Sequence, residues 1–259
     1  MSGRDKDVMV FHFEPKRKVY LVSMHLENRP GALGNLADIL AVRGMNILEG
    51  FFGGMSHQDK ATLSFFLETT NQRMDEAWLK DYIESSVYAS DVEVKPQVEG
   101  LIVDSVNFPL TWNTGDRAVM MRIEGVREMI DTILGTQAES GASAVYDLGY
   151  NYGKEAWVNL VSTVQPKNKA ILSEMLKIYS ATGWGRPELV ELDMGGNRAK
   201  VRLHDCFECA SPQEGARSSN FVRGHIGGAF SAIFGSEVRA SEPKCIGRGD
   251  GVCEFDVSR

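Results

Sequence analysis

The feature that most constrains the fold is an alternation of strand and helix patterns over the first hundred residues. Residues 19–26 are rich in β-forming side chains and end at the turn cluster Glu27-Asn28-Arg29-Pro30-Gly31. From Ala32 the apolar residues recur at helical spacing, and Gly44 provides a C-cap. Two strands, a second helix and a last strand follow, and their predicted ranges are 46–54, 61–67, 75–85 and 92–94.

This βαββαβ order predicts a ferredoxin-like domain. The first turn with its helix start, Asn28-Arg29-Pro30-Gly31-Ala32-Leu33, and the later Gly44-Met45-Asn46-Ile47 resemble the ACT domain, a regulatory module that often binds amino acids. The resemblance covers residues 17–96 and makes 1–16 an N-terminal extension. It implies an effector site, whose residues are Asn28, Pro30, Gly31, Ala32 and Ile47. It also implies a homodimer, and dimerisation without any effector is the alternative.

Composition limits the class of protein. The 259 residues are 43% hydrophobic and 24% charged, as expected for one large or two ordinary soluble domains. The net charge of -7 argues against direct binding to nucleic acid or to an anionic membrane, because phosphate contacts need a basic surface. The apolar runs are shorter than the roughly 20 residues of a membrane helix. The charged N-terminus resembles no secretory signal, so we expect a cytoplasmic protein.

The rest of the chain predicts a second domain over 105–259, after a linker at 97–104. Its strand hairpin turns at Gly195-Gly196-Asn197, and a glycine-rich helix is expected over 218–234. Those glycines favour either close helix packing or room for a ligand. The remaining elements are helices near 126–133, 142–148 and 168–182, and closing strands at 237–244 and 253–257. We therefore expect an α+β protein whose second domain packs helices on an antiparallel sheet.

All four cysteines lie in the last quarter of the chain. In a reducing compartment such clustering favours metal or redox chemistry over structural disulfides. Three glycines between Cys245 and Cys253 let the backbone fold back and bring these two thiols together. Thiolates suit zinc, and Glu242 can supply a carboxylate ligand. A labile disulfide and a pair of buried thiols are the alternatives.

Residues 105–259 are similar to the 4-vinyl-reductase domain, and the similarity is most specific in their C-terminal third. The segments that carry the similarity are Arg223-Gly224-His225 through Phe230, Phe234 to Val238, and Glu242 to Phe255. The family includes sensor domains of phenol-responsive transcription activators, in which three cysteines and a glutamate hold zinc. The resemblance implies that Glu242, Cys245 and Cys253 are ligands, while Ser219 stands where the remaining cysteine is expected. Cys206 is then the substitute ligand, with Cys209 as the alternative, and the zinc is structural.

The same resemblance implies an apolar cavity for a small hydrophobic or aromatic ligand. The candidates for its lining are Tyr150, Trp157, Trp184, Phe207, Phe221 and His225. Because no catalytic signature stands out, we expect a small-molecule-binding regulatory or sensor protein that acts through a partner protein or a change of assembly. The alternatives are a redox enzyme or accessory factor that uses the cysteines, with iron and sulfur for example, and a purely structural dimerisation scaffold.

Overall fold

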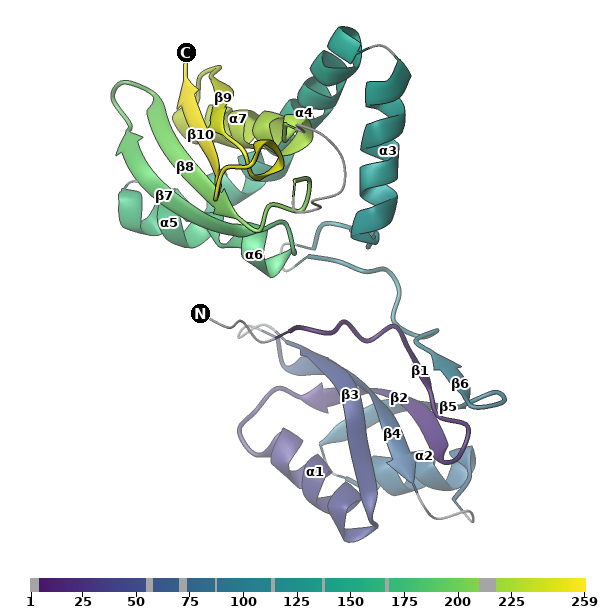
Figure 1. Ribbon diagram of the computed structural model, residues 1–259. Coiled ribbons are helices and arrows are strands. Elements are labelled where there is room, and N and C mark those ends of the chain that lie inside the picture. The colour runs from purple at the N-terminus through teal and green to yellow at the C-terminus, as the bar shows by residue number, and fades with distance from the viewer. Residues whose placement is uncertain are drawn as a thin grey trace. The chain divides into compact units, whose positions relative to one another are not determined.

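The computed structural model describes residues 5–54, 58–69, 74–86, 88–112, 115–136, 138–165, 168–209 and 218–259 (Figure 1). The chain divides into two compact units, Met1–Val119 and Met120–Arg259. Each unit combines an antiparallel four-stranded sheet with helices, which confirms the predicted α+β class. In the described part of the chain, no helix is both long and apolar enough to cross a membrane.

The main sheet of the first unit has the strand order β3-β4-β2-β5. Its elements are β2 (Lys18–Glu27), α1 (Ala32–Val42), β3 (Met45–Gly53), β4 (Lys60–Thr69), α2 (Glu76–Glu84) and β5 (Ala89–Pro96). Both helices pack on one face, where Leu36 and Leu79 meet Phe65 in a fully buried core. The order βαββαβ and the antiparallel pairing confirm the ferredoxin-like fold expected from the sequence.

A second, two-stranded sheet covers part of the other face. It consists of β1 (Phe11–Phe13) and β6 (Leu101–Val103), and Ile102 packs with Leu21 and Phe66 of the main sheet. This unit therefore extends beyond the linker that the sequence suggested at 97–104. The reason is that β6 lies within that range and pairs with β1, which belongs to the predicted N-terminal extension.

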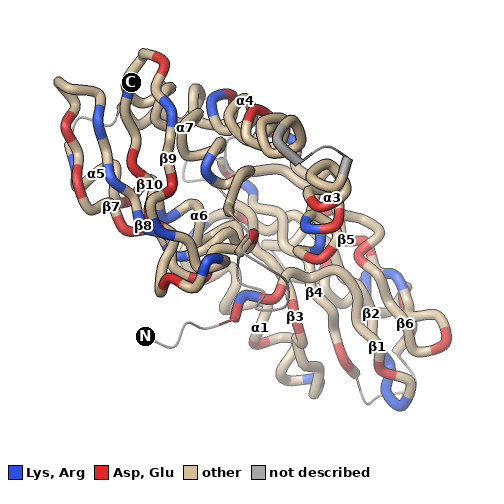
Figure 2. The backbone as a smooth tube through the Cα atoms, turned by 45° about the horizontal axis from the view of Figure 1, so that its top comes forward, with Lys and Arg blue, Asp and Glu red and all other residues tan. Residues whose placement is uncertain are grey.

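The second unit has a sheet in the order β7-β8-β10-β9. Its elements are α3 (Ile123–Thr136), α4 (Ala138–Val164), α5 (Lys169–Leu176), α6 (Ile178–Ala181), β7 (Arg186–Asp193), β8 (Arg198–His204), α7 (Asn220–Phe234), β9 (Arg239–Lys244), a 3₁₀ turn (Ile246–Arg248) and β10 (Cys253–Ser258). One face of the sheet carries cross-strand ion pairs such as Arg202–Glu254 and Lys200–Asp256. Figure 2 shows that basic and acidic residues both occur along the strands of this sheet. The other face is apolar, and Phe255 packs there in one core with Phe230 of α7.

Helices α4 and α7 are in backbone contact. A Cβ on Gly149 of α4 would lie 2.1 Å from a carbonyl oxygen of α7, and one on Gly224 of α7 would lie 2.0 Å from a carbonyl oxygen of α4. The same holds one turn later for Gly153 and Gly228. These contacts support the interpretation that the glycines of this helix allow close helix packing, and not the interpretation that they leave room for a ligand.

Candidate functional site

Three segments of the second unit bring together four potential metal ligands. Cys209 follows β8, Glu242 lies on β9, Cys245 follows β9 directly and Cys253 begins β10. One ligand atom from each lies within 4.8 Å of the others, and all four residues are buried. The Sγ of Cys245 is 3.4 Å from that of Cys209 and 3.9 Å from that of Cys253. The cysteines of the described chain form no disulfide.

The loop between Cys245 and Cys253 is held in a conformation that presents both sulfurs inward. The Asp250 carboxylate accepts a hydrogen bond from the Cys245 N–H at 2.8 Å, and Gly249 has a φ of 93°, which favours glycine. The Ile246 N–H donates to the Cys253 sulfur at 3.4 Å. Hydrogen bonds from Cys206, Cys209 and Cys245 lower the pKa of Cys253, which favours the thiolate that a metal binds.

Glu242 is hydrogen-bonded to Ser219, the residue that directly precedes α7. Its Oε2 accepts the backbone N–H of Ser219 at 3.1 Å, and its Oε1 accepts the Ser219 hydroxyl. Arg248 lies 3.8 Å from Oε2 and donates to the Glu242 carbonyl oxygen at 2.7 Å. Burial raises the pKa of this carboxyl group. The serine at the position of the missing cysteine therefore orients the glutamate instead of supplying a sulfur.

Cys206 lies beside the four-donor group and not in it. Its buried thiol contacts Cys209 and Cys253, whereas the fourth donor is Cys209. The expectation favoured Cys206, and the reason for the difference is a tight turn in which the Cys209 N–H donates to the Cys206 carbonyl oxygen at 3.1 Å. The turn places the Cys209 thiol, and not the Cys206 thiol, next to Cys245 and Glu242. The spacing of two cysteines alone could not choose between them.

Glu208 directly precedes Cys209, and the sequence patterns did not indicate that its carboxylate reaches the start of α7. Its buried carboxylate accepts backbone N–H groups of Phe221 at 3.1 Å and Val222 at 2.8 Å. These groups belong to the first turn of α7, which has no intrahelical acceptors for them. Burial raises the pKa of Glu208 to about 7. Glu208 is far from the start of α7 in the sequence, so no local pattern pointed to this role.

The donor set fits a metal ion chemically. Three thiols and one carboxylate from a buried, hydrogen-bonded site match the ligand types that zinc prefers in four-coordinate sites. Four protein ligands leave no open position for water or substrate, so such a site stabilises structure instead of activating a reactant.

A cluster of ring-bearing side chains surrounds His225 of α7. The imidazole Nδ1 lies 2.8 Å from the Tyr179 hydroxyl, and the ring centroids of Trp184 and Tyr152 lie 4.6 Å and 5.2 Å away. Burial lowers the pKa of His225 to about 3, so the ring is neutral near pH 7. The members of this aromatic cluster are Tyr152, Trp157, Tyr179, Trp184, Phe207, Phe221 and His225.

The aromatic cluster contains every predicted lining residue except Tyr150. The Tyr150 hydroxyl is 2.9 Å from Ser231 Oγ, and its ring stacks near Tyr146. Two residues along a helix correspond to about 200° of rotation, so Tyr150 and Tyr152 point to different sides of α4. The structure therefore replaces Tyr150 with Tyr152 in the cluster and adds Tyr179.

In the first unit, the predicted effector residues lie at one turn and on an edge strand. Gly31 has a φ of 88° and caps α1, and the buried Ala32 begins that helix. The Asn28 amide donates to the Gln58 carbonyl oxygen at 2.9 Å. Pro30 is exposed in the same turn, and Ile47 is partly exposed on β3.

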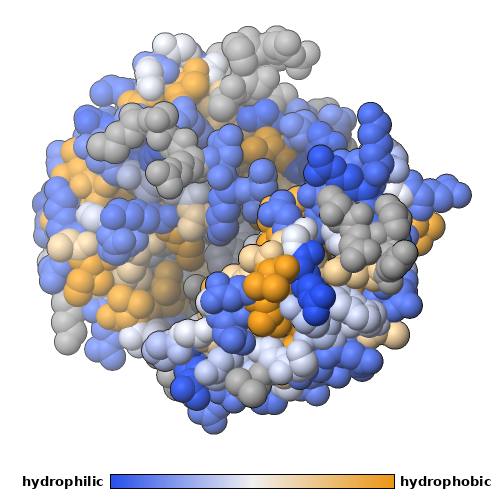
Figure 3. Space-filling view, turned by 90° about the horizontal axis from the view of Figure 1, so that it is seen from below, coloured by the Kyte–Doolittle hydropathy of each residue, from blue (hydrophilic) through white to orange (hydrophobic). Residues whose placement is uncertain are grey.

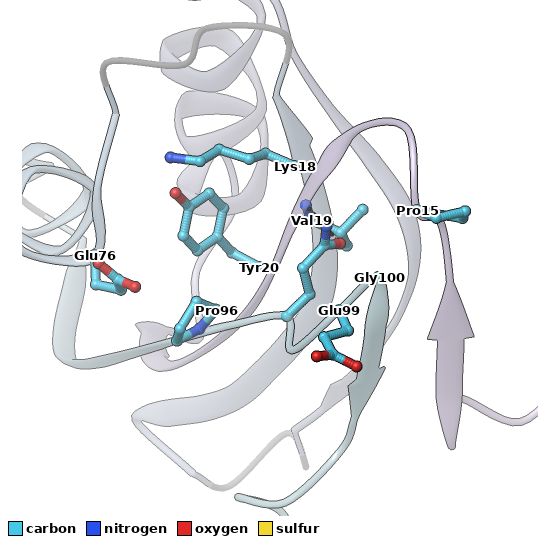
Figure 4. Close-up of a pocket in the computed structure, with 9 residues that line it drawn as sticks. Pro15, Lys18, Val19, Tyr20, Glu76, Pro96, Glu99 and Gly100 are labelled. Carbon is cyan, nitrogen blue, oxygen red and sulfur yellow. Dashed lines mark hydrogen bonds between the residues drawn. The ribbon is translucent and has the colours of Figure 1, made fainter.

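A groove of about 500 Å³ opens at the opposite end of β2 from this turn. Lys18, Tyr20, Glu76 and Glu99 line it together with backbone of the turn that follows β5 (Figure 4). The Tyr20 hydroxyl donates to the Met74 carbonyl oxygen at 2.8 Å. The predicted effector residues do not line this groove.

The second unit is thus an α+β module with a buried thiol and carboxylate site. Residues 199–259 match the V4R domain. Two curated relatives are the uncharacterized proteins MJ1642 and MJ0150 of Methanocaldococcus jannaschii. MJ1642 is 32% identical over 111 residues, which make up 42% of this chain and 62% of that protein. MJ0150 is 27% identical over 166 residues, which make up 64% of this chain and 88% of that protein.

Solved structures also resemble part of the chain. The phenol-responsive sensory domain of the transcription activator PoxR, solved with phenol, is 16% identical at a TM-score of 0.49 and covers 56% of this chain and 78% of that chain. A vinyl-4-reductase family protein from Methanocaldococcus jannaschii is 19% identical at a TM-score of 0.36, and the match covers 56% of this chain and 84% of that chain. Trafficking protein particle complex subunit 3 from Naegleria fowleri is 12% identical at a TM-score of 0.41, and the match covers 52% of this chain and 91% of that chain.

Proposed function

We propose that this chain is a small-molecule-binding regulatory protein whose second unit holds a structural zinc ion and senses a small hydrophobic or aromatic ligand. The observation that carries the proposal is that the same two segments build both sites. Phe207 belongs to the aromatic cluster, and Cys209 in the same turn belongs to the metal site. Ser219, the N-cap residue of α7, hydrogen-bonds to Glu242, and His225 of α7 lies within the aromatic cluster.

Zinc would be held by Cys209, Glu242, Cys245 and Cys253. When bound, it cross-links the turn after β8 with the ends of β9 and β10. The V4R match over 199–259 spans all four of these residues and supports the assignment. Because Ser219 is hydrogen-bonded to Glu242, a shift of Glu242 would then move the start of α7.

The ligand would bind beside His225. The neutral imidazole uses Nδ1 for Tyr179, so Nε2 is the nitrogen that a ligand hydroxyl would meet. Trp184 and Phe221 supply apolar ring surface, and the half-exposed Tyr152 marks the side from which a ligand would enter. A ligand that displaced Phe207 or turned His225 would change the position of the metal-site turn or of α7.

The first unit would act as an ACT-like regulatory domain. An amino acid or another small effector would bind at the turn that contains Asn28, Pro30, Gly31 and Ala32, with Ile47 of the edge strand β3 as a further binding residue. The left-handed conformation of Gly31 supports this assignment, because the missing Cβ allows close approach there. We also propose that the protein works as a homodimer and passes its signal to a protein partner.

Metal analysis by mass spectrometry with a visible spectrum tests the proposal on wild type, Cys253→Ala and Cys206→Ser. Wild type should contain about one zinc ion per chain. Cys253→Ala should lose this zinc and should have a lower Tm. Cys206→Ser distinguishes the two possible ligand sets, because the Cys206 thiol contacts Cys209 and Cys253 but lies outside the donor group, so this variant should retain zinc. Iron with visible absorbance would replace the proposal with the redox alternative, and a metal-free wild type would refute the zinc site.

A further inference from the structure

Strands β1 and β6 use only one face of their small sheet to contact the rest of the first unit. Ile102 is buried against Val19 and Phe66, and the His12 ring centroid lies 6.2 Å from that of Phe66. His12 and Ile102 are directly opposite each other in the antiparallel register. They therefore form the inner face, and the residues on either side of them point to the outer face.

All four side chains on the outer face are apolar. Phe11 pairs with Val103 and Phe13 with Leu101, and these side chains are 60%, 47%, 61% and 44% exposed in that order. Exposed apolar side chains occur elsewhere on this protein (Figure 3), but here they form two adjacent cross-strand pairs. A sheet with one solvated face alternates apolar and polar residues, whereas a sheet buried on both faces does not. The outer face of the β1–β6 sheet thus has the composition of a covered surface.

We propose that the outer face of the β1–β6 sheet binds the same face of a second copy of this chain. This inference rests on the homodimer proposed above and names its surface. The large side chains lie on β1 and the smaller ones on β6, so the surface is self-complementary about a twofold axis parallel to the strands. Such an axis lays β1 over β6 of the partner subunit, with Phe13 over Leu101 and Phe11 over Val103.

The area of this surface agrees with a second copy as the occupant. A phenylalanine presents about 150–250 Å², so the two phenylalanines at these exposures offer roughly 200–300 Å² and the four residues about 400 Å². Two copies would bury about 800 Å² before the rim is counted. An interface of this size lies at the low end of the range for specific complexes. A reversible dimer of moderate affinity follows.

Sedimentation equilibrium of the full chain tests the proposal. Wild type should dimerise, and Phe13→Glu should raise the dimer dissociation constant at least ~100-fold, because a carboxylate would be buried against Leu101 of the partner subunit. Val42→Glu is the matched control, because Val42 is an equally apolar and 81% exposed residue of α1 in the same unit. Its dissociation constant should change less than ~3-fold. Circular dichroism verifies that both variants are folded.

A charge pair tests the orientation of the two copies. Phe13→Lys and Leu101→Glu should each be monomeric alone, and a mixture of the two should form a heterodimer through the Lys–Glu contact. A mixture that stays monomeric would overturn the placement of β1 over β6 of the partner subunit. A wild type that is monomeric at about 100 μM, or a Phe13→Glu variant that dimerises like wild type, would overturn the interface itself.

The same samples separate this inference from the sensor proposal. The metal site and the aromatic cluster lie entirely in the second unit. Phe13→Glu should therefore be monomeric and still contain zinc. A wild type without zinc would contradict the metal-site proposal and leave the dimer result unaffected. A Phe13→Glu variant that dimerises like wild type would contradict only the proposed interface.

Discussion

The backbone N–H of Ser219 lies 3.1 Å from the Oε2 of Glu242, and the Ser219 hydroxyl donates to the other oxygen of the same carboxylate. Ser219, which directly precedes α7, therefore orients the one carboxylate of the candidate metal site. Since both residues are buried, water cannot replace these hydrogen bonds. This contact links the candidate metal site to the helix that also carries His225.

Replacement of Ser219 by alanine should weaken the metal site. The hydroxyl donates to a buried carboxylate, so its loss should lower the free energy of unfolding by about 1.5–3 kcal/mol and accelerate zinc loss to a chelator. Denaturant titration with and without chelator measures both effects. Ser162→Ala is the control, because its hydroxyl only bonds within the exposed surface of α4, and it should be neutral. A Ser219→Ala variant as stable as wild type would contradict the orienting role of this residue.

Alanine at Gly224 should be strongly destabilising. Its Cβ would lie 2.0 Å from the Tyr146 carbonyl oxygen, which is backbone of a packed helix and cannot move aside locally. We expect a loss of about 3 kcal/mol or more in the free energy of unfolding, measured by chemical denaturation. Gly125→Ala on α3 is the matched control, because nothing lies within 4 Å of its Cβ position. The better helix propensity of alanine should make that variant up to about 1 kcal/mol more stable.

The buried His225 should make folding pH-dependent. Its pKa is lowered to about 3 by burial, so between pH 3 and the ordinary value near 6.5 the unfolded state binds more protons than the native state. Stability should therefore fall as the pH falls through this window, by about 2 kcal/mol at pH 5. Glu208, whose pKa is raised to about 7, contributes in the opposite direction over part of the window.

The comparison of wild type with His225→Phe isolates the histidine contribution. Glu208 is the same in both proteins, so its effect cancels in the difference between the two stability-versus-pH curves. The variant carries a constant cost for the unpaired Tyr179 hydroxyl, but it should lack the loss of stability on acidification. Parallel curves from pH 7.5 to about 5 would show that His225 does not titrate as its burial requires.

Small aromatic compounds should stabilise the second unit. Phenol is a suitable probe, because it can meet the imidazole of His225 through its hydroxyl group and the ring of Trp184 through its face. At saturating concentration it should raise the Tm of wild type and have little effect on His225→Phe. Tyr150→Phe is the control, because Tyr150 bonds Ser231 and lies outside the aromatic cluster, so the shift should persist. An equal shift in wild type and His225→Phe would place the ligand elsewhere.

Local sequence patterns predicted much of the first unit. The apolar spacing from Ala32 and the turn at Gly31 fixed the start of α1, and β2, β3, β4 and α2 lie close to their predicted ranges. The same patterns failed at 97–104, where Leu101–Val103 pairs with Phe11–Phe13 from the other end of the unit. Pairing over that sequence distance leaves no periodic signal in a segment of three residues.

The candidate metal site was likewise predictable from the sequence only in part. The glycine-rich loop between Cys245 and Cys253 is local, and its turn chemistry predicted that the two thiols meet. The choice between Cys206 and Cys209 is tertiary, because it depends on which thiol of one turn faces β9. Glu208 became recognisable only when its carboxylate was found at the start of α7.

The sequence by itself determined the α+β class, the βαββαβ order and the residue types that can bind a metal, because strand and helix periodicity and turn chemistry depend on neighbours in the chain. The tertiary structure alone decided that Cys209 completes the donor group, that Tyr152 replaces Tyr150 beside His225 and that β1 pairs with β6. Each of these depends on contacts between segments far apart in sequence, and such contacts are set by the packing of whole elements.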